Sequence, residues 1–276
     1  MLIHSYKPSC FGFGDFLRGH IALLQKFGVP NVSMSLQQTN LATLFKAEKF
    51  TTHNPNINVN CDVWHKDKLR LNNVSSNDAE RVICCNHFFT FPISSEIKEH
   101  MRNLLELNDE TYSQVINLAK RLNLDLYNFN VLHIRNSSEL TKNALVDTTL
   151  SNQQYKNILN VIEEHSLNEP RWFICTDTFS NKLFFKRKDI TYLDRKPLHS
   201  SIRHLFPFDV LCDHFIMRYS NKIIQITDGG AVHFWGSGYS DSVNWIYDVP
   251  IEHYDTTGYI KNICLDRAGA LKLIHS

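Results

Sequence analysis

The sequence predicts an α/β fold built from two Rossmann-like halves. Short apolar runs, each the length of a buried strand, alternate along the chain with stretches whose apolar residues recur at helical spacing. A second series of such units begins at Phe129. This alternation is typical of mainly parallel sheets covered by helices. We therefore expect two domains that meet near Tyr127, residues 1–127 and residues 128–276.

In the first half, four short apolar runs predict strands and four stretches of helical periodicity predict helices. The expected strands are residues 2–6, 32–36, 56–64 and 81–89. The expected helices are residues 15–27, 40–50, 96–107 and 109–124. The alternation of the two kinds of element favours parallel strand pairing.

The second half repeats this alternation. Strands are expected at residues 129–135, 171–176, 189–194 and 221–227, and helices at 151–165, 179–186 and 206–220. Ser151 and Gln154 have the spacing of a capping box, and Pro207 suits the first turn of a helix. A polar loop is expected after residue 135, and a last helix is expected to begin within 228–235.

The bulk composition is that of a globular protein with no strong charge preference for its partners. The chain has 276 residues, of which 43% are hydrophobic and 21% are charged, and its formal net charge is +1. A net charge this small gives no field that attracts nucleic acid or an anionic membrane. No apolar run approaches the ~20 residues that cross a bilayer, and the Met1 end lacks the features of a signal peptide. We expect a cytoplasmic protein with no membrane span and no nucleic-acid partner.

The seven cysteines predict reduced thiols rather than a disulfide framework, because their number is odd and no CxxC pair occurs. Cys84 and Cys85 precede Asn86 and His87, but they lie in an apolar strand-like run. No second pair of ligands has the spacing of a zinc site. The sequence therefore predicts no metal centre.

Polar residues follow the first predicted strand, at the edge where parallel sheets bind ligands. Gly12 and Gly14 let the backbone approach a ligand closely, and Asp15 and Arg18 follow them into the next helix. The alternative is a plain strand-to-helix turn in which Asp15 is the N-cap.

His133 and Arg135 lie two residues apart on a predicted strand, so their side chains share one face. An arginine at the carboxyl end of a strand has the forked geometry that suits phosphate oxygens. The alternative is a satisfied interior histidine beside a structural ion pair.

Two further strand ends carry small and polar residues. Thr176 and Asp177 follow a buried strand, where Asp177 could accept hydrogen bonds from a nucleotide or cap the next helix. The other turn is a natural cradle for a diphosphate and consists of Thr227, Asp228, Gly229, Gly230, Ala231 and Val232.

Taken in order, these four loops resemble the motifs of the fucosyltransferase superfamily of GT-B type. That superfamily includes the α-1,2- and α-1,6-fucosyltransferases and the protein O-fucosyltransferases. The HxR motif resembles VLHIRNSS, the second motif WFICTD and the third NKIIQITDGGAVHFW, and the N-terminal glycine loop is similar to GFGDFLRGH. The resemblance implies a GT-B-type glycosyltransferase architecture.

The resemblance also implies an activity: inverting transfer of fucose from GDP-fucose to a hydroxyl of a glycan acceptor. GDP-fucose would be the co-substrate, with no other cofactor and no obligatory metal. Arg135 would contact the donor diphosphate and steady the leaving group, and Asp15 would activate the acceptor hydroxyl. Residues 128–276 would bind the donor and residues 1–127 would form the acceptor side. The implied donor-binding residues are Gly12, Gly14, Arg18, His133, Arg135, Thr176, Asp177, Thr227, Asp228, Gly229, Gly230, Ala231 and Val232.

Two alternatives remain open on the same scaffold. Asn136-Ser137-Ser138 stands where many members continue with Arg-Gly-Asp, so the transferred sugar could differ from fucose. The other alternative is a catalytically silent module that binds a nucleotide or a glycan. The presence of both Asp15 and Arg135 favours an enzyme, since a binding module has no need of the pair.

Overall fold

The computed structural model describes most of the chain in two compact units. The described residues are 2–57, 59–62, 81–135, 140–141, 144–145, 150–166, 171–182, 185, 189–195, 206–227, 237–257 and 260–261. The first unit takes in Met1–Gln114, Leu198–Cys212 and Trp245–Tyr247, and the second unit takes in Val115–Pro197, Asp213–Asn244 and Asp248–Ser276. Helices α3 (Asp109–Arg121), α6 (Pro207–Met217) and α7 (Gly238–Tyr247) therefore contribute residues to both units.

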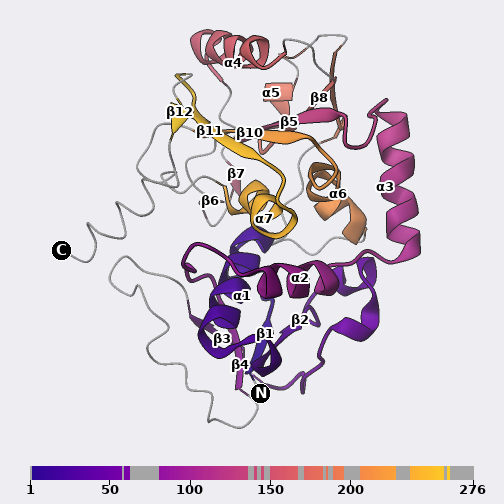
Figure 1. The fold of residues 1–276 in the computed structure, drawn as a ribbon, viewed down its shortest axis with the longest axis vertical. Helices are drawn as coiled ribbons and strands as arrows, with labels where there is room; N and C mark the ends of the chain where they lie inside the picture. The colour runs from indigo at the N-terminus through magenta and orange to yellow at the C-terminus, as the bar shows by residue number, and fades with distance from the viewer. Residues whose placement is uncertain are drawn as a thin grey trace, which may run out of the picture. The chain divides into compact units, whose positions relative to one another are not determined.

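The first unit contains a four-stranded parallel sheet (Figure 1). Its strands are β1 (Leu2–Ser5), β2 (Val32–Ser35), β3 (Asn60–Asp62) and β4 (Arg81–Cys85), in the order β2-β1-β4-β3. Strand β2 lies on one side of β1, and β4 followed by β3 lies on the other side. The topological switch point therefore lies between β1 and β4, which is where ligands bind in open α/β sheets.

Helix α1 (Phe13–Phe27) follows β1 and packs closely against β4. Its apolar stripe is fully buried and includes Phe16, Leu17 and Ile21. Gly19 makes the close approach possible, because a Cβ atom at this position would lie 2.0 Å from the backbone oxygen of Cys85. The first unit also holds α2 (Ser95–Leu104), whose N-cap Ser94 accepts a hydrogen bond from the backbone N–H of Ile97.

The second unit contains a six-stranded sheet in the order β12-β11-β10-β5-β8-β9. Its strands are β5 (Phe129–Arg135), β8 (Arg171–Thr176), β9 (Ile190–Tyr192), β10 (Lys222–Thr227), β11 (Ile251–Asp255) and β12 (Ile260–Lys261). All neighbouring strands run parallel except β11 and β12. The chain adds β8 and β9 on one side of β5 and then β10 and β11 on the other. The switch point lies between β5 and β10, whose carboxyl ends carry Arg135 and Thr227 in register.

The two faces of this sheet differ in chemistry. One face presents Leu132 and Ile134 of β5 to α4 (Asn152–Glu164), in a core that also contains Trp172 and Ile224. The other face presents His133 of β5 to the beginning of α7. Figure 1 shows α4 on one side of the sheet and the beginning of α7 on the other. The alternation of side chains along β5 thus directs His133 and Arg135 away from the apolar core.

Most predicted elements are present. The bounds of β5 and β8 match the expected strands, and Ser151 caps α4 in the expected capping box with Gln154. Helix α1 begins at Phe13, two residues before the expected start. Helix α5 (Phe179–Lys182) covers the beginning of the expected helix 179–186, and residues 183–184 and 186 lie outside the described residues.

Three expectations differ from the structure. The expected helix 40–50 is two short 3-10 helices, η2 (Leu41–Leu44) and η3 (Ala47–Lys49). Buried Phe45 lies between them and forms an antiparallel bridge with Leu107, which pulls the backbone out of the helical conformation. The polar loop after β5 contains the short paired strands β6 (Leu140–Thr141) and β7 (Ala144–Leu145). Strands β11 and β12 were not expected. The start of a helix expected within 228–235 lies outside the described residues, and α7 begins at Gly238.

The cysteine expectation is also wrong, because a disulfide joins Cys10 to Cys61. The two residues are separated by 51 positions, so no local spacing signals the bond. Four further cysteines among the described residues are buried and belong to no disulfide: Cys84, Cys85, Cys175 and Cys212. Within the same described part of the chain, no helix is both long and apolar enough to cross a bilayer.

Candidate functional site

Arg135 lies at the switch point of the second sheet, at the carboxyl end of β5. Its Nε atom is 3.5 Å from Oδ2 of Asp177, which directly follows the neighbouring strand β8. The Arg135 side chain keeps 23% of its surface exposed, whereas that of Asp177 keeps 8%. Among the described residues, no hydrogen bond occupies the two terminal nitrogens of the guanidinium. Asp177 thus fixes the guanidinium at one nitrogen while the forked end remains available to an anion.

His133 connects the same strand to the beginning of α7. Its Nδ1 atom lies 2.7 Å from Oγ of Ser240, in the first turn of that helix. Burial lowers the pKa of His133 from 6.5 to about 4, while nearby Asp177 raises it and nearby Arg135 lowers it by smaller amounts. The imidazole is therefore neutral at physiological pH. It acts in this geometry as a brace between β5 and α7.

A buried polar network continues from Ser240 across the sheet. The side-chain amide of Gln225 on β10 donates to Oγ of Ser240 at 2.6 Å and to Oδ1 of Asp241 at 3.0 Å. The Nε2 atom of His253 on β11 lies 2.9 Å from the same Asp241 oxygen. Gln225 Oε1 accepts a hydrogen bond of 2.7 Å from the backbone N–H of Ser237. Side chains from three adjacent strands therefore fix the beginning of α7.

The N-terminus of α7 is suited to an anion. The first N–H groups of a helix have no intrahelical acceptor and carry a partial positive charge. Gly238 begins the helix, and Ser237 at its N-cap makes no side-chain cap. Because His133 holds Ser240 of this first turn, the helix start lies beside the strand that carries Arg135. A guanidinium and a helix N-terminus on the same face of a sheet form a binding site for phosphate oxygens.

A second polar arrangement lies at the switch point of the first sheet. Asp15 stands in the first turn of α1, where its Oδ1 atom is 3.0 Å from NH1 of Arg18. Gly12 is the N-cap, so the alternative in which Asp15 caps the helix is wrong. The Asp15 side chain keeps 38% of its surface exposed. A carboxylate in this position can accept a proton from a bound hydroxyl.

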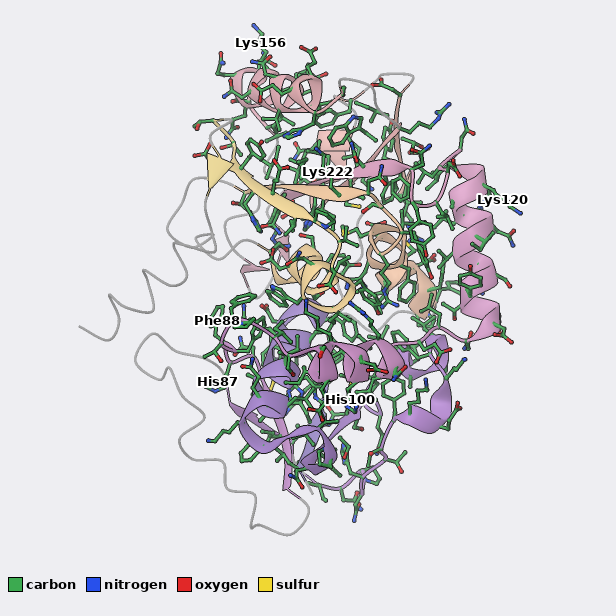
Figure 2. The ribbon with its side chains drawn as sticks, in the orientation of Figure 1. His87, Phe88, His100, Lys120, Lys156 and Lys222 are labelled. Carbon is green, nitrogen blue, oxygen red and sulfur yellow. A yellow bond between two sulfur atoms is a disulfide. The ribbon has the colours of Figure 1, made fainter. Side chains whose placement is uncertain are left out.

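Arg18 is held from three sides inside the first unit. Its Nε atom donates to the backbone oxygen of Asn86 at 2.9 Å, and its guanidinium lies 4.0 Å from the ring centroid of Phe88, labelled in Figure 2. Only 7% of the residue is exposed. These contacts fit a residue that orients Asp15 better than one that contacts a ligand directly.

The other expected site residues that the structure describes lie at the ends of β8 and β10 and at the start of α1. Thr176 is buried, and its Oγ1 atom accepts a hydrogen bond of 3.2 Å from the backbone N–H of Thr178. Thr227 is buried opposite Arg135. Gly12 is the N-cap of α1, and Gly14 lies in its first turn. The remaining members of the expected diphosphate cradle lie outside the described residues: Asp228, Gly229, Gly230, Ala231 and Val232.

Sequence reasoning missed Ser240, Asp241 and His253. Ser237-Gly238 before an amphipathic stretch is a helix-start signal that could have pointed to the beginning of α7. The contacts with His133 and Gln225 carry no local signal, because they depend on tertiary packing. Among the described His, Cys, Asp and Glu residues, the one group that could hold a metal ion is Cys10, Cys61 and Cys84, none of which belongs to the arrangements above.

Comparison with known proteins identifies the fold. No protein-family model and no curated protein sequence matches the chain. The solved structure of fucosyltransferase NodZ from Bradyrhizobium aligns with a TM-score of 0.54 and 13% identity, covering 94% of this chain and 97% of NodZ. NodZ alpha-1,6-fucosyltransferase co-crystallised with GDP gives a TM-score of 0.53 at 13% identity, covering 94% of this chain and 96% of NodZ.

A plant enzyme has the same fold. A mutant of Arabidopsis thaliana FUT1 in complex with GDP aligns with a TM-score of 0.51 and 6% identity, covering 92% of this chain and 70% of FUT1. The chain therefore has a fucosyltransferase-like fold, as the sequence predicted. Its two mainly parallel sheets are consistent with a GT-B-like glycosyltransferase.

Proposed function

We propose that the protein is an inverting glycosyltransferase that moves fucose from GDP-fucose to a hydroxyl of a glycan acceptor. The observation that carries the proposal is the partly exposed guanidinium side chain of Arg135, which pairs with Asp177 at the switch point of the second sheet. The neighbouring N-terminus of α7 adds a second group that favours a diphosphate. The fold shared with fucosyltransferases supports the choice of donor.

In the proposed reaction, an acceptor hydroxyl attacks the anomeric carbon of fucose. The bond from that carbon to the β-phosphate oxygen breaks, and its electron pair stays on GDP. Arg135 stabilises the negative charge that develops on the diphosphate, so no metal ion is required. The carboxylate of Asp15 takes the proton of the hydroxyl. The products are the fucosylated acceptor and GDP.

This mechanism assigns a role to each half of the chain. Residues 128–276 bind the donor through Arg135, Asp177 and the first turn of α7, together with the segment 227–232. Residues 1–127 form the acceptor side, where Asp15 stands in the first turn of α1.

A second candidate function is a catalytically silent module that binds a nucleotide or a glycan. The ion pairs Arg135–Asp177 and Arg18–Asp15 favour it, because each is also what a purely structural pair looks like. Transfer of another nucleotide-activated sugar is the alternative within enzymes. Transfer assays with a panel of donors distinguish the three functions.

The donor assignment predicts that GDP stabilises the protein and that UDP does not. A ligand at about 100 times its dissociation constant stabilises the folded state by about 2.7 kcal/mol. We expect thermal-shift measurements to show an increase in Tm with GDP and with GDP-fucose, unchanged by EDTA. Equal shifts with GDP and UDP would exclude the donor assignment and leave the fold unaffected.

The proposed base predicts a selective loss of turnover in Asp15→Asn. The amide keeps the size of the side chain but cannot accept the hydroxyl proton, so we expect kcat to fall by about 10²–10⁴ while the Kd for GDP stays unchanged. Isothermal titration and a transfer assay measure the two effects. Asp109→Asn is the matched control, since Asp109 also stands in the first turn of a helix. Full activity in Asp15→Asn contradicts a catalytic role and leaves Asp15 as a partner of Arg18.

A further inference from the structure

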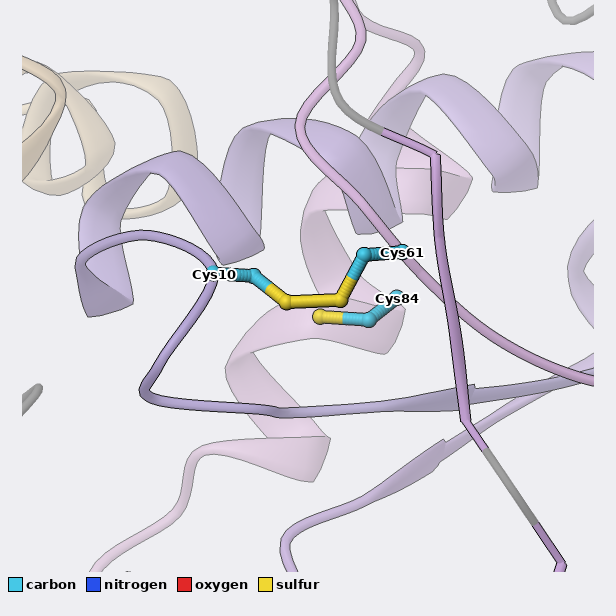
Figure 3. Close-up of side chains that lie close together, drawn as sticks. All are labelled: Cys10, Cys61 and Cys84. Carbon is cyan, nitrogen blue, oxygen red and sulfur yellow. A yellow bond between two sulfur atoms is a disulfide. The ribbon is translucent and has the colours of Figure 1, made fainter.

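Three cysteine sulfurs meet in the first unit, although their residues are far apart in the sequence. Cys61 on β3 and Cys84 on β4 are partners in the parallel register, so their side chains project from the same face of the sheet. Cys10 reaches them from the loop between β1 and α1, and the three sulfurs lie within 4.8 Å of one another (Figure 3). The disulfide joins two of these sulfurs, and the third belongs to the buried thiol of Cys84.

The surroundings of Cys84 contain groups that favour a negatively charged sulfur. Cys84 is fully buried and lies close to the backbone and the positive charge of Lys7. An N–H donor and a cation near a buried sulfur stabilise the thiolate that a bound metal ion produces.

We propose that Cys10, Cys61 and Cys84 form a binding site for a thiophilic divalent cation such as Zn²⁺, which opens when the Cys10–Cys61 disulfide is reduced. Tetrahedral Zn²⁺ with sulfur ligands at about 2.3 Å places those sulfurs about 3.8 Å apart. This separation lies within the 4.8 Å that spans the cluster, and it requires the bonded sulfurs of Cys10 and Cys61 to move apart. Cys10 lies in a loop and Cys61 is exposed, so both can separate once the disulfide opens.

Reduction of the Cys10–Cys61 disulfide precedes binding of the cation. Two equivalents of a thiol reductant convert the disulfide to two thiols and leave as one oxidised disulfide. The cation then displaces three protons and binds three thiolates, with a water molecule as the fourth ligand. The resulting site carries one net negative charge, which the ammonium group of Lys7 offsets.

The bound ion would replace the disulfide as a tether. Cys10 lies two residues before Gly12, the N-cap of α1, so either link holds the loop before that helix to the sheet. The site thus keeps the loop attached under reducing and under oxidising conditions. Its ligands are separate from Arg135 and Asp15, so the proposal does not depend on the proposed transfer reaction.

The test is cobalt binding by the full-length protein under anaerobic conditions. One sample is reduced with dithiothreitol, which is then removed by gel filtration, and another is left oxidised. We expect the reduced protein to bind one Co²⁺ per chain with a thiolate-to-cobalt charge-transfer band that Zn²⁺ abolishes. We expect the oxidised protein to show no such band. Absence of the band after reduction, or an equal band without reduction, overturns the proposal.

Two adjacent residues of β4 provide a matched pair of variants. Cys84→Ser removes the third sulfur but keeps the disulfide pair, so we expect the reduced variant to lose the charge-transfer band. Cys85→Ser is the control, because the Cys85 thiol is equally buried but contacts the backbone oxygen of Gly19 at 3.7 Å. If Cys84→Ser does not fold, Cys61→Ser removes a ligand at an exposed position. A full band in either ligand variant overturns the proposal, and an unchanged band in Cys85→Ser supports it.

Discussion

We expect Arg135→Ala to lower the rate of fucosyl transfer by about 10²–10³ and to weaken GDP binding at the same time. The size of the effect corresponds to the loss of one donor that stabilises developing negative charge in a transition state. GDP-fucose before the transfer and GDP after it carry the same diphosphate. The loss of Arg135 therefore weakens the affinity for GDP as well as lowering the rate. Steady-state kinetics and calorimetric titration with GDP measure the two quantities.

Arg135→Lys should recover little of this loss. A lysine ammonium is a point charge and cannot make two parallel hydrogen bonds to phosphate oxygens. It also lacks the Nε atom through which Arg135 contacts Asp177 at 3.5 Å. We therefore expect Arg135→Lys to resemble Arg135→Ala more than the wild type, with the fold retained by circular dichroism.

Arg171→Ala is the matched control for both variants. Arg171 stands at the amino end of β8, on the edge of the sheet opposite the carboxyl ends of the strands. Its removal should leave the Kd for GDP and the turnover close to those of the wild type. Normal GDP binding by Arg135→Ala would contradict the assignment of the donor site to this strand end.

The second large effect concerns stability in acid. Four buried histidines have depressed pKa values: burial lowers that of His4 to about 3, that of His133 to about 4, and those of His20 and His214 well below 6.5. In the unfolded chain each binds a proton near pH 6.5, so the unfolded state binds more protons below that pH. The free energy of unfolding therefore falls as the pH decreases from 6.5, and levels off only below the folded pKa values.

Well below pH 6.5, the expected loss approaches about 1.4 kcal/mol per pH unit for each histidine. His4 and His20 belong to the first unit and His133 and His214 to the second, so each unit should lose about 2.8 kcal/mol per pH unit. Since domains are stable by only about 5–15 kcal/mol, we expect acid unfolding to begin near pH 5. Urea unfolding at pH 7.5, 6.5 and 5.5 measures the slope.

His214 is suited to a test by substitution, because its contacts define which ring nitrogen carries the proton. Arg218 can only donate, and its NH2 atom lies 3.4 Å from Nδ1 of His214, so Nδ1 is the acceptor. Nε2 then carries the proton and donates to Oγ of Ser242 at 3.0 Å. A second proton on Nδ1 would face the guanidinium, which also lowers the pKa of His214. His214→Gln should reduce the pH slope of the second unit by about 1.4 kcal/mol per pH unit, and an unchanged slope would contradict this account.

The fold was predictable where local signals are strong. Strands β5 and β8 are buried on both faces, so their apolar runs have clear ends. Strand β11 was missed because four of its five residues are only partly buried and polar residues interrupt the run. The broken helix around Phe45 could not be read from the sequence either. Its periodicity is helical, and the pairing with Leu107 that overrides it is a tertiary contact.

The placement of the candidate site residues was predictable in part. The two-residue period of a strand places His133 and Arg135 on one face, and parallel pairing brings Asp177 to the same edge. The partner of His133 was not predictable, since α7 begins eleven residues after β10 ends. The meeting of Cys10, Cys61 and Cys84 depends on strand order in the same way.

The polar network around the first turn of α7 has a consequence for how the sequence can change over evolution. Gln225 donates to both Ser240 and Asp241, and each of these side chains also contacts a histidine. An exchange of one member for an apolar residue leaves a buried polar atom without a partner, which costs about 1–3 kcal/mol. Compatible exchanges must therefore occur together. In related sequences we expect positions 133, 225, 240, 241 and 253 to covary as one set, while the apolar positions facing α4 vary independently of them.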